Sequence, residues 1–260
     1  MTAEDGPTIE QPLPARPGLL RRGLMEGIGT FALVTAGCGA IVTNATHPGS
    51  LGGVGISLVF GLVIMVMIYA GGHLSGAHYN PSVTLAFALA RHFPVRDALA
   101  YIAAQLAGAT AAAFLLLAAW PGKPAHLGAT LPSVPGGTAL AYEIVLTAFL
   151  MFVITAVATD TRAVGAAAAI AIGGTVGLDA LFGGPITGAS MNPARSFGPA
   201  LASGTWSSFW VYLAGPVVGA SIGVFAYELV RGPARPPAAR STHTAKGATA
   251  DGERPVRLPA

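Results

Sequence analysis

Two asparagine–proline pairs, Asn80-Pro81 and Asn192-Pro193, carry the clearest chemical potential in this sequence, because each begins an apolar stretch of about ten residues. Asparagine is a favoured N-cap and proline is favoured at the first helical position, so each pair predicts the start of a helix. A helix start carries partial positive charge, and a capping asparagine keeps an amide group free to donate hydrogen bonds. Two such ends meeting at one place would bind neutral polar molecules and disfavour cations.

The two pairs lie in matching frames. Ser-Gly-Ala-His-Tyr-Asn-Pro at residues 75–81 corresponds to Thr-Gly-Ala-Ser-Met-Asn-Pro at residues 187–193, which lies 112 positions later. A single Asn-Pro pair would more often mark a turn, but two pairs in one frame indicate an internal duplication. Inverted repeats with broken helices place their functional site at the membrane midplane, between the copies.

The composition indicates that these segments lie in a membrane. Of the 260 residues, 53% are hydrophobic and only 10% are charged, whereas a soluble domain carries about 25% charged residues. Charged residues are absent from the intervals 27–90, 98–122 and 196–227. The sequence has no nucleophile–base set and no metal-ligand set, so we expect neither an enzyme nor a cofactor. The basic residues lie at the ends of apolar segments, which argues against nucleic acid as a partner.

The apolar pattern predicts an all-α integral membrane protein with six transmembrane helices and two re-entrant half-helices in an inverted repeat. The predicted spans are residues 19–42, 53–71, 95–120, 138–158, 164–182 and 209–230. The remaining apolar pieces, 81–90 and 193–202, would each be about 15 Å long, roughly half of the hydrocarbon core. The channel domain would cover residues 19–231, with repeats at 19–120 and 138–231. We expect tails at residues 1–18 and 232–260, and the composition of the second predicts disorder.

Positive charges predict the orientation. If six spans alternate, one side of the membrane receives nearly all of the cations: Arg16, Arg21, Arg22, Arg91, Arg96, Arg162, Arg231, Arg235, Arg240, Lys246, Arg254 and Arg257. This excess predicts that both termini are cytoplasmic in a multi-pass protein of the plasma membrane. The alanine-rich composition and the short loops suggest a bacterial source.

The segments at residues 73–84 and 187–199 resemble the two signature boxes of the aquaporin, or major intrinsic protein, family. The first box reads Asn-Pro-Ser, with Ser82 after the pair, and the second reads Asn-Pro-Ala, with Ala194. The resemblance implies a passive channel for water and small neutral solutes that excludes ions and protons. It also implies a homotetramer in the lipid bilayer, with one pore in each subunit and no cofactor or metal.

The same resemblance implies a selectivity filter made of Phe60, Ala180, Ala189 and Arg195. Arg195 is a charge within the membrane, which is costly and normally functional, whereas Phe60 alone would more often be a core aromatic. Ala180 lies where strict water channels have histidine, which favours glycerol-sized solutes or undissociated metalloid hydroxides. Ser196 lies where glycerol facilitators have aspartate, so the pattern is most similar to nodulin-26-like and related bacterial broad-range channels. The alternative is a channel mainly for water.

The acidic residues in the spans allow two interpretations. Glu26 and Glu143, 117 positions apart, would brace the re-entrant loops by accepting backbone N–H bonds, or they would relay protons in a coupled secondary transporter. Asp179 would either face the pore mouth or satisfy a loop. His73 and His78 have no cysteine or acid at ligand spacing, so we interpret them as loop-bracing or pore-lining residues.

Overall fold

The structure is a computed structural model that describes residues 17–160 and 167–232. Its described elements are α1 (Leu19–Thr46), α2 (Gly52–Ser75), α3 (Pro81–Leu89), α4 (Val95–Ala119), the short turn η1 (Pro124–Gly128), α5 (Gly136–Thr159), α6 (Ala168–Thr187), α7 (Pro193–Ser203) and α8 (Val211–Arg231). Six of them are long and apolar enough to span a membrane, namely α1, α2, α4, α5, α6 and α8. Apart from residues 17, 18 and 232, the predicted tails lie outside the described residues.

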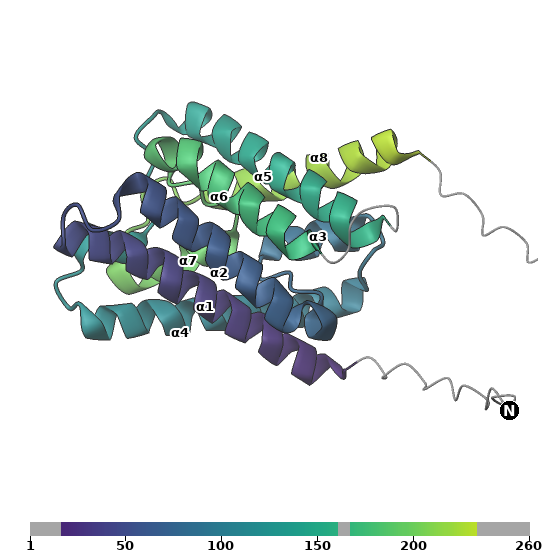
Figure 1. The fold of residues 1–260 in the computed structure, drawn as a ribbon, viewed down its shortest axis with the longest axis horizontal. Coiled ribbons are helices and arrows are strands. Elements are labelled where there is room, and N and C mark those ends of the chain that lie inside the picture. The colour runs from purple at the N-terminus through teal and green to yellow at the C-terminus, as the bar shows by residue number, and fades with distance from the viewer. Residues whose placement is uncertain (1–16, 161–166, 233–260) are drawn as a thin grey trace, which may run out of the picture.

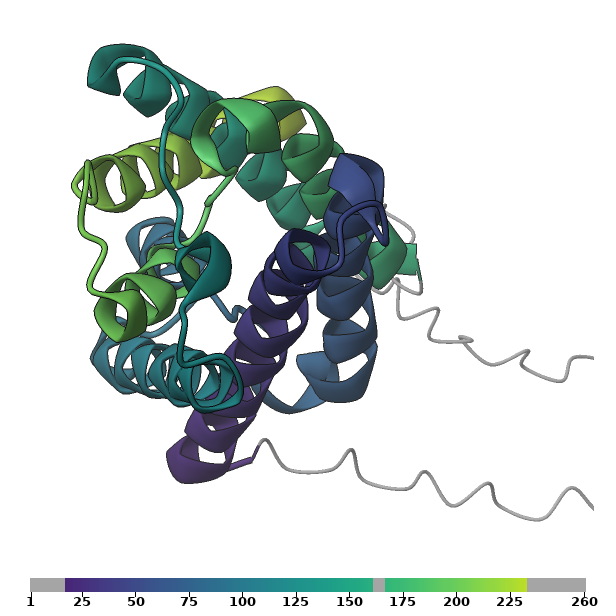
Figure 2. The same cartoon turned by 90° about the vertical axis from the view of Figure 1, so that its left-hand side faces the viewer.

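The six long helices form an elongated bundle, and α1 begins at the same end of the bundle at which α8 ends (Figure 1). We call this the terminal end. Around the bundle the long helices follow the order α1, α2, α6, α5, α8 and α4, with α7 packed against α4 (Figure 2). The short helices α3 and α7 are the half-helices that the sequence predicts, and both begin at their Asn-Pro pairs.

Equivalent glycines let the helices of each repeat approach closely. A Cβ atom on Gly108 of α4 would collide with the carbonyl oxygen of Gly27 in α1, and a Cβ on Gly219 of α8 would collide with that of Ile144 in α5. Gly108 and Gly219 are 111 positions apart. The duplication seen in the sequence therefore appears again as two matching helix crossings, α1 with α4 and α5 with α8.

Helices α1, α2 and α5 are longer than the apolar runs that predict them. Helix α1 continues to Thr46, where the hydroxyl donates to the Val42 carbonyl oxygen at 2.9 Å, so a polar residue extends the helix beyond the predicted end. Helix α6 covers Ala168–Thr187, so it continues past the predicted end at residue 182 and includes Pro185 near its own end, whereas the predicted start at residue 164 lies outside the described residues. The chain after η1 covers this last turn, because Ser133 donates from its backbone nitrogen to the Ile186 carbonyl oxygen at 2.9 Å.

Candidate functional site

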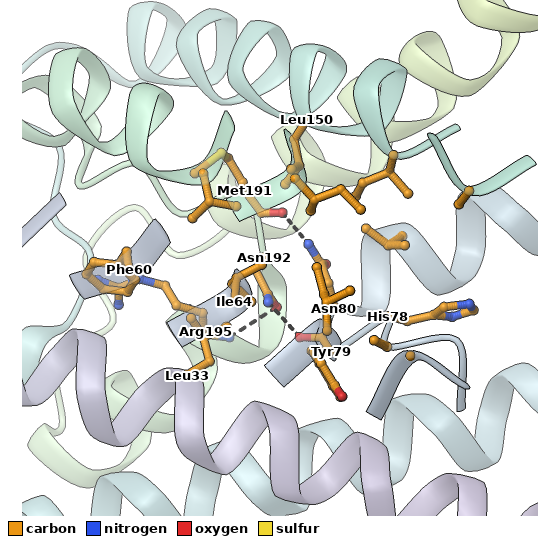
Figure 3. A pocket seen from close by; sticks show the side chains of 18 of the residues that line it. Leu33, Phe60, Ile64, His78, Tyr79, Asn80, Leu150, Met191, Asn192 and Arg195 are labelled. Carbon is orange, nitrogen blue, oxygen red and sulfur yellow. Dashed lines mark hydrogen bonds between the residues drawn. The ribbon is translucent and has the colours of Figure 1, made fainter. Parts of the chain in front are cut away.

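The loops before α3 and α7 meet inside the bundle, where each capping asparagine bonds to the other loop (Figure 3). The Asn80 side-chain oxygen accepts from the Ser82 backbone N–H at 2.9 Å, and its Nδ2 donates to the Met191 carbonyl oxygen at 2.7 Å. One side chain therefore starts the first half-helix and also ties it to the second loop.

Asn192 makes the equivalent contacts in the second repeat. Its side-chain oxygen accepts from the backbone N–H groups of Ala194 and Arg195 at 3.0 and 3.2 Å, and its Nδ2 donates to the Tyr79 carbonyl oxygen at 2.8 Å. The sequence predicts wholly free amide groups at both asparagines. In the structure each amide uses one of its two hydrogens in the cross-link, which leaves one donor for a solute.

Glu26 of α1 is fully buried and binds the first loop. Its Oε1 accepts from the Ser75 hydroxyl at 2.6 Å and from the His78 backbone N–H at 3.0 Å. Its Oε2 accepts from the Tyr79 backbone N–H at 2.6 Å and from the Gln105 amide at 2.8 Å. Both carboxylate oxygens are thus occupied by donors from the loop and from neighbouring helices.

Glu143 of α5 makes the matching contacts with the second loop. Its Oε1 accepts from the Thr187 hydroxyl at 2.7 Å and from the Ser190 backbone N–H at 2.9 Å, and its Oε2 accepts from the Met191 backbone N–H at 2.9 Å. The backbone of these loops adopts left-handed conformations at residues other than glycine, for example at Met191 with φ 52°. Such a conformation is costly and persists where surrounding contacts fix it, as this carboxylate does.

A cavity of about 290 Å³ passes the two asparagines, and it is lined by all four residues that the sequence assigns to the filter: Phe60, Ala180, Ala189 and Arg195. Phe60 comes from α2, Ala180 from α6, and the other two from the second loop and α7. The Arg195 guanidinium carbon lies 5.0 Å from the centre of the Phe60 ring, within the range of a cation–π contact. The two alanines contribute only methyl groups to the same lining.

The loop between α4 and α5 holds Arg195 in place, a contact that the sequence analysis does not predict. The Arg195 Nη1 donates to the Gly128 carbonyl oxygen at 2.8 Å, while its Nε has no hydrogen-bond partner among the described residues. Gly128 has a φ of 77°, and a Cβ there would collide with Cys38. Gly128 is a weak signal in the sequence, because many loops contain a glycine.

The hydroxyl of Thr130, in the same loop, also binds the second box. It donates to the Ser196 hydroxyl at 2.8 Å, and Ser196 in turn lies 2.6 Å from the Ser190 hydroxyl. Ser196 occupies the position at which the sequence analysis notes a departure from glycerol facilitators. In the structure its hydroxyl is buried in this chain of contacts rather than facing the cavity.

The remaining predicted residues occupy varied positions. Pro81 and Pro193 are the first residues of α3 and α7, and both are buried. Asp179 is fully buried in α6 and does not line the cavity. Neither of its carboxylate oxygens has a hydrogen-bond partner within the described residues. The structure therefore shows neither a residue at the pore mouth nor one that satisfies a loop. His78 lines the cavity and lies 3.1 Å from the Thr84 hydroxyl, whereas His73 is exposed near the end of α2.

Curated plant proteins match most of this chain. Aquaporin NIP1-1 of Zea mays is 50% identical over 212 residues, which is 82% of this chain and 75% of the maize protein. Nodulin-26 of Glycine max is 46% identical over 212 residues, which is 82% of this chain and 78% of the soybean protein. These relatives show that the prediction of a bacterial source is wrong, because they point to a plant membrane. Alanine content and loop length do not distinguish the two sources.

The fold and the family are established by two further matches. The X-ray structure of the aquaglyceroporin from Plasmodium falciparum superimposes with a TM-score of 0.72 at 27% identity, covering 82% of this chain and 97% of that one. The family model for the major intrinsic protein matches residues 15–227, which include both Asn-Pro boxes and all six spans apart from the last residues of α8. The chain therefore belongs to the major intrinsic protein family.

Proposed function

We propose that this chain is a passive channel for water and for small neutral solutes such as glycerol, and that it excludes ions and protons. The observation that carries the proposal is the composition of the cavity wall, where Arg195 and Phe60 share one lumen with the methyl groups of Ala180 and Ala189. Undissociated metalloid hydroxides belong to the same class of solute, because they are neutral and carry several hydroxyl groups.

The polar groups of the cavity account for selection against cations. Asn80 and Asn192 cap two helix starts, each with a partial positive charge of about half a unit, and Arg195 adds a full charge. A neutral hydroxylated solute accepts hydrogen bonds from these donors. A cation or a hydronium ion gains no such interaction and is repelled, so a continuous proton-conducting water wire is interrupted here.

A proton-coupled transporter is the less favoured alternative. It would need a carboxylate that can exchange protons with the lumen, whereas Glu26 and Glu143 line no part of the cavity and each accepts at least three hydrogen bonds from the loops and nearby side chains. We propose instead that these two residues brace the loops that position the asparagines.

Permeation by glycerol distinguishes the proposed channel from the alternative, a channel mainly for water. Ala180 and Ala189 leave a wider and less polar wall than a histidine would, which favours carbon-bearing solutes. The similarity in fold to a protein described as an aquaglyceroporin supports the same choice. The relatives among the NIP aquaporins and nodulin-26 agree with the filter pattern noted in the sequence. We further propose that the chain assembles as a homotetramer in the bilayer.

Paired stopped-flow measurements on proteoliposomes test the solute. Osmotic water flux and glycerol flux are recorded for the wild type and for Ala180→His at equal protein content. We expect the wild type to pass both. The imidazole would narrow the lumen beside Arg195. The variant should therefore lose about tenfold of its glycerol flux, which corresponds to a free-energy barrier about 1.4 kcal/mol higher. Its retained water flux is the control for folding and reconstitution.

The two other outcomes are equally informative. A wild type that passes water but no glycerol would establish the water-channel alternative, despite the two alanines. A glycerol flux that depends on an imposed proton gradient and saturates would establish the transporter instead.

A further inference from the structure

The offset of 112 positions between the two Asn-Pro frames gives each predicted filter residue a counterpart in the other repeat. The pairs are Phe60 with Ile172, Ala180 with Ile68, Ala189 with Ala77, and Arg195 with Val83. We call the four counterparts, Ile68, Ala77, Val83 and Ile172, the isoleucine ring.

The isoleucine ring lines the same cavity as the predicted filter, on the other side of the capping asparagines. Ile68 lies in the last third of α2, which ends at the terminal end of the bundle, and Ile172 lies near the start of α6, which begins there. On the same two helices, Phe60 and Ala180 lie further from the terminal end. The lumen therefore passes two rings of equivalent position, one before and one after the asparagines.

The local backbone supports this equivalence. Ala77 and Ala189 follow glycines with φ of 91° and 86°, and both alanines have positive φ themselves, 51° and 41°. Val83 and Arg195 are each the third residue of a half-helix that begins with proline. The two rings thus share their backbone frame and differ in their side chains.

The side chains give the two rings opposite chemistry. The predicted filter contains the guanidinium group of Arg195, whereas the isoleucine ring has only aliphatic side chains, which neither donate nor accept hydrogen bonds. Both α2 and α6 contribute a branched aliphatic residue to the ring, and Val83 takes the place of the arginine. Water that enters an apolar constriction gives up hydrogen bonds without replacing them, and such constrictions act as gates by dewetting.

We propose that the isoleucine ring is a second selectivity element, an apolar barrier at the terminal end that limits water more than it limits a polyol. This proposal rests on the proposed function. A polyol presents carbon-bound surface to the aliphatic side chains, while a water molecule has none. The ring therefore lowers the ratio of water flux to glycerol flux.

Valine and threonine provide the test, because they have nearly the same shape and differ by one hydroxyl group. The variants are Val83→Thr, compared with the wild type, and Ile172→Thr, compared with Ile172→Val. Water and glycerol fluxes are measured in proteoliposomes of equal protein content. The matched control is Val66→Thr, because Val66 lies on α2 with 51% of its surface exposed on the outside of the bundle and lines no part of the cavity.

We expect each ring threonine to raise water flux by at least about twofold over its aliphatic partner, a barrier change of about 0.4 kcal/mol. Glycerol flux should change less, so the ratio of water to glycerol rises. Val66→Thr should leave both fluxes unchanged. The proposal would be overturned if Val83→Thr passed water no faster than the wild type and Ile172→Thr no faster than Ile172→Val. It would also be overturned if the Val66→Thr control raised water flux as much as the ring variants do.

Failure of the proposed function gives a different pattern. If the wild type passes neither solute, the chain is not the channel proposed and the barrier has no role. If the wild type passes both and the paired variants do not differ, the channel stands and only the isoleucine ring proposal fails. A further variant, Ile68→Phe, adds bulk at the ring, and the proposal requires it to reduce both fluxes.

Discussion

At the scale of single residues, the cavity depends on side chains whose polar atoms are only partly occupied. Arg195 is anchored through Nη1 to Gly128 and through its ring contact with Phe60, which leaves its Nε unpartnered among the described residues. Asn80 and Asn192 each keep one amide hydrogen. Because the anchors fix the orientation, the free amide hydrogens of the two asparagines are presented to a solute without a cost in side-chain entropy at the moment of passage.

Asp179 is the exception, because it is buried without a partner inside the described residues and does not line the cavity. An unsatisfied buried polar group costs about 1–3 kcal/mol, and a charged one more. We therefore predict that Asp179→Asn raises the thermal midpoint of unfolding in detergent, since it removes the charge at constant shape. A lower midpoint would mean that the carboxylate is bound in the working protein.

Asp97→Asn is the matched control for that measurement. Asp97 accepts a hydrogen bond from Arg22 at 2.9 Å, and the side chains of both residues are about one-tenth exposed or less. Removing one partner of a buried ion pair costs about 3–5 kcal/mol, because the other charge remains buried. The two substitutions make the same chemical change and should shift the midpoint in opposite directions.

At the scale of elements, the sequence predicts the six spans and both half-helices because apolar runs and Asn-Pro caps are local signals. The end of α6 is missed, since Pro185 suggests a break while the chain at Ser133 covers the last turn. The role of Gly128 is missed as well. Its carbonyl oxygen meets Arg195 across 67 positions, and any residue type offers a carbonyl oxygen. Such contacts depend on tertiary geometry and leave no residue pattern to detect.

The glycine crossings yield a prediction for whole helices. In Gly108→Ala the new Cβ would meet the Gly27 carbonyl oxygen, which is backbone and cannot move aside alone, so α1 and α4 must separate. Overpacking of this kind costs about 1–3 kcal/mol. We expect a lower thermal midpoint and a lower water flux per protein. Gly174→Ala on α6 is the control, because a Cβ there meets nothing within 4 Å, and it should be neutral or slightly stabilising.

A loss of stability in both glycine variants would show that close helix approach is not the cause. The expected contrast arises because Gly108 faces a neighbouring helix and Gly174 faces outward. The equivalent crossing at Gly219 provides an independent repetition, since its Cβ would meet the carbonyl oxygen of Ile144. Gly219→Ala should therefore resemble Gly108→Ala.

At the scale of the whole molecule, one chain supplies both asparagines and both rings that line the cavity. Both asparagines, the predicted filter and the isoleucine ring line a single cavity within one copy. The two repeats bond to each other through Asn80 and Asn192 (Figure 3). A second copy is not needed to complete the wall. Assembly into a tetramer would therefore multiply the pores rather than create one between subunits.

This independence can be tested by mixing subunits. Wild-type chains are co-expressed with chains occluded by Ala180→Trp, a variant whose own flux is first shown to be negligible, and tetramers of known composition are reconstituted. We expect water flux to fall in proportion to the occluded fraction, so an equal mixture keeps about half of the flux. A pore shared by four subunits would need all of them intact and would keep only about one-sixteenth in a random mixture. Because the filter and the isoleucine ring act in series within each chain, the linear result should hold equally when the occluding residue is placed at Ile172.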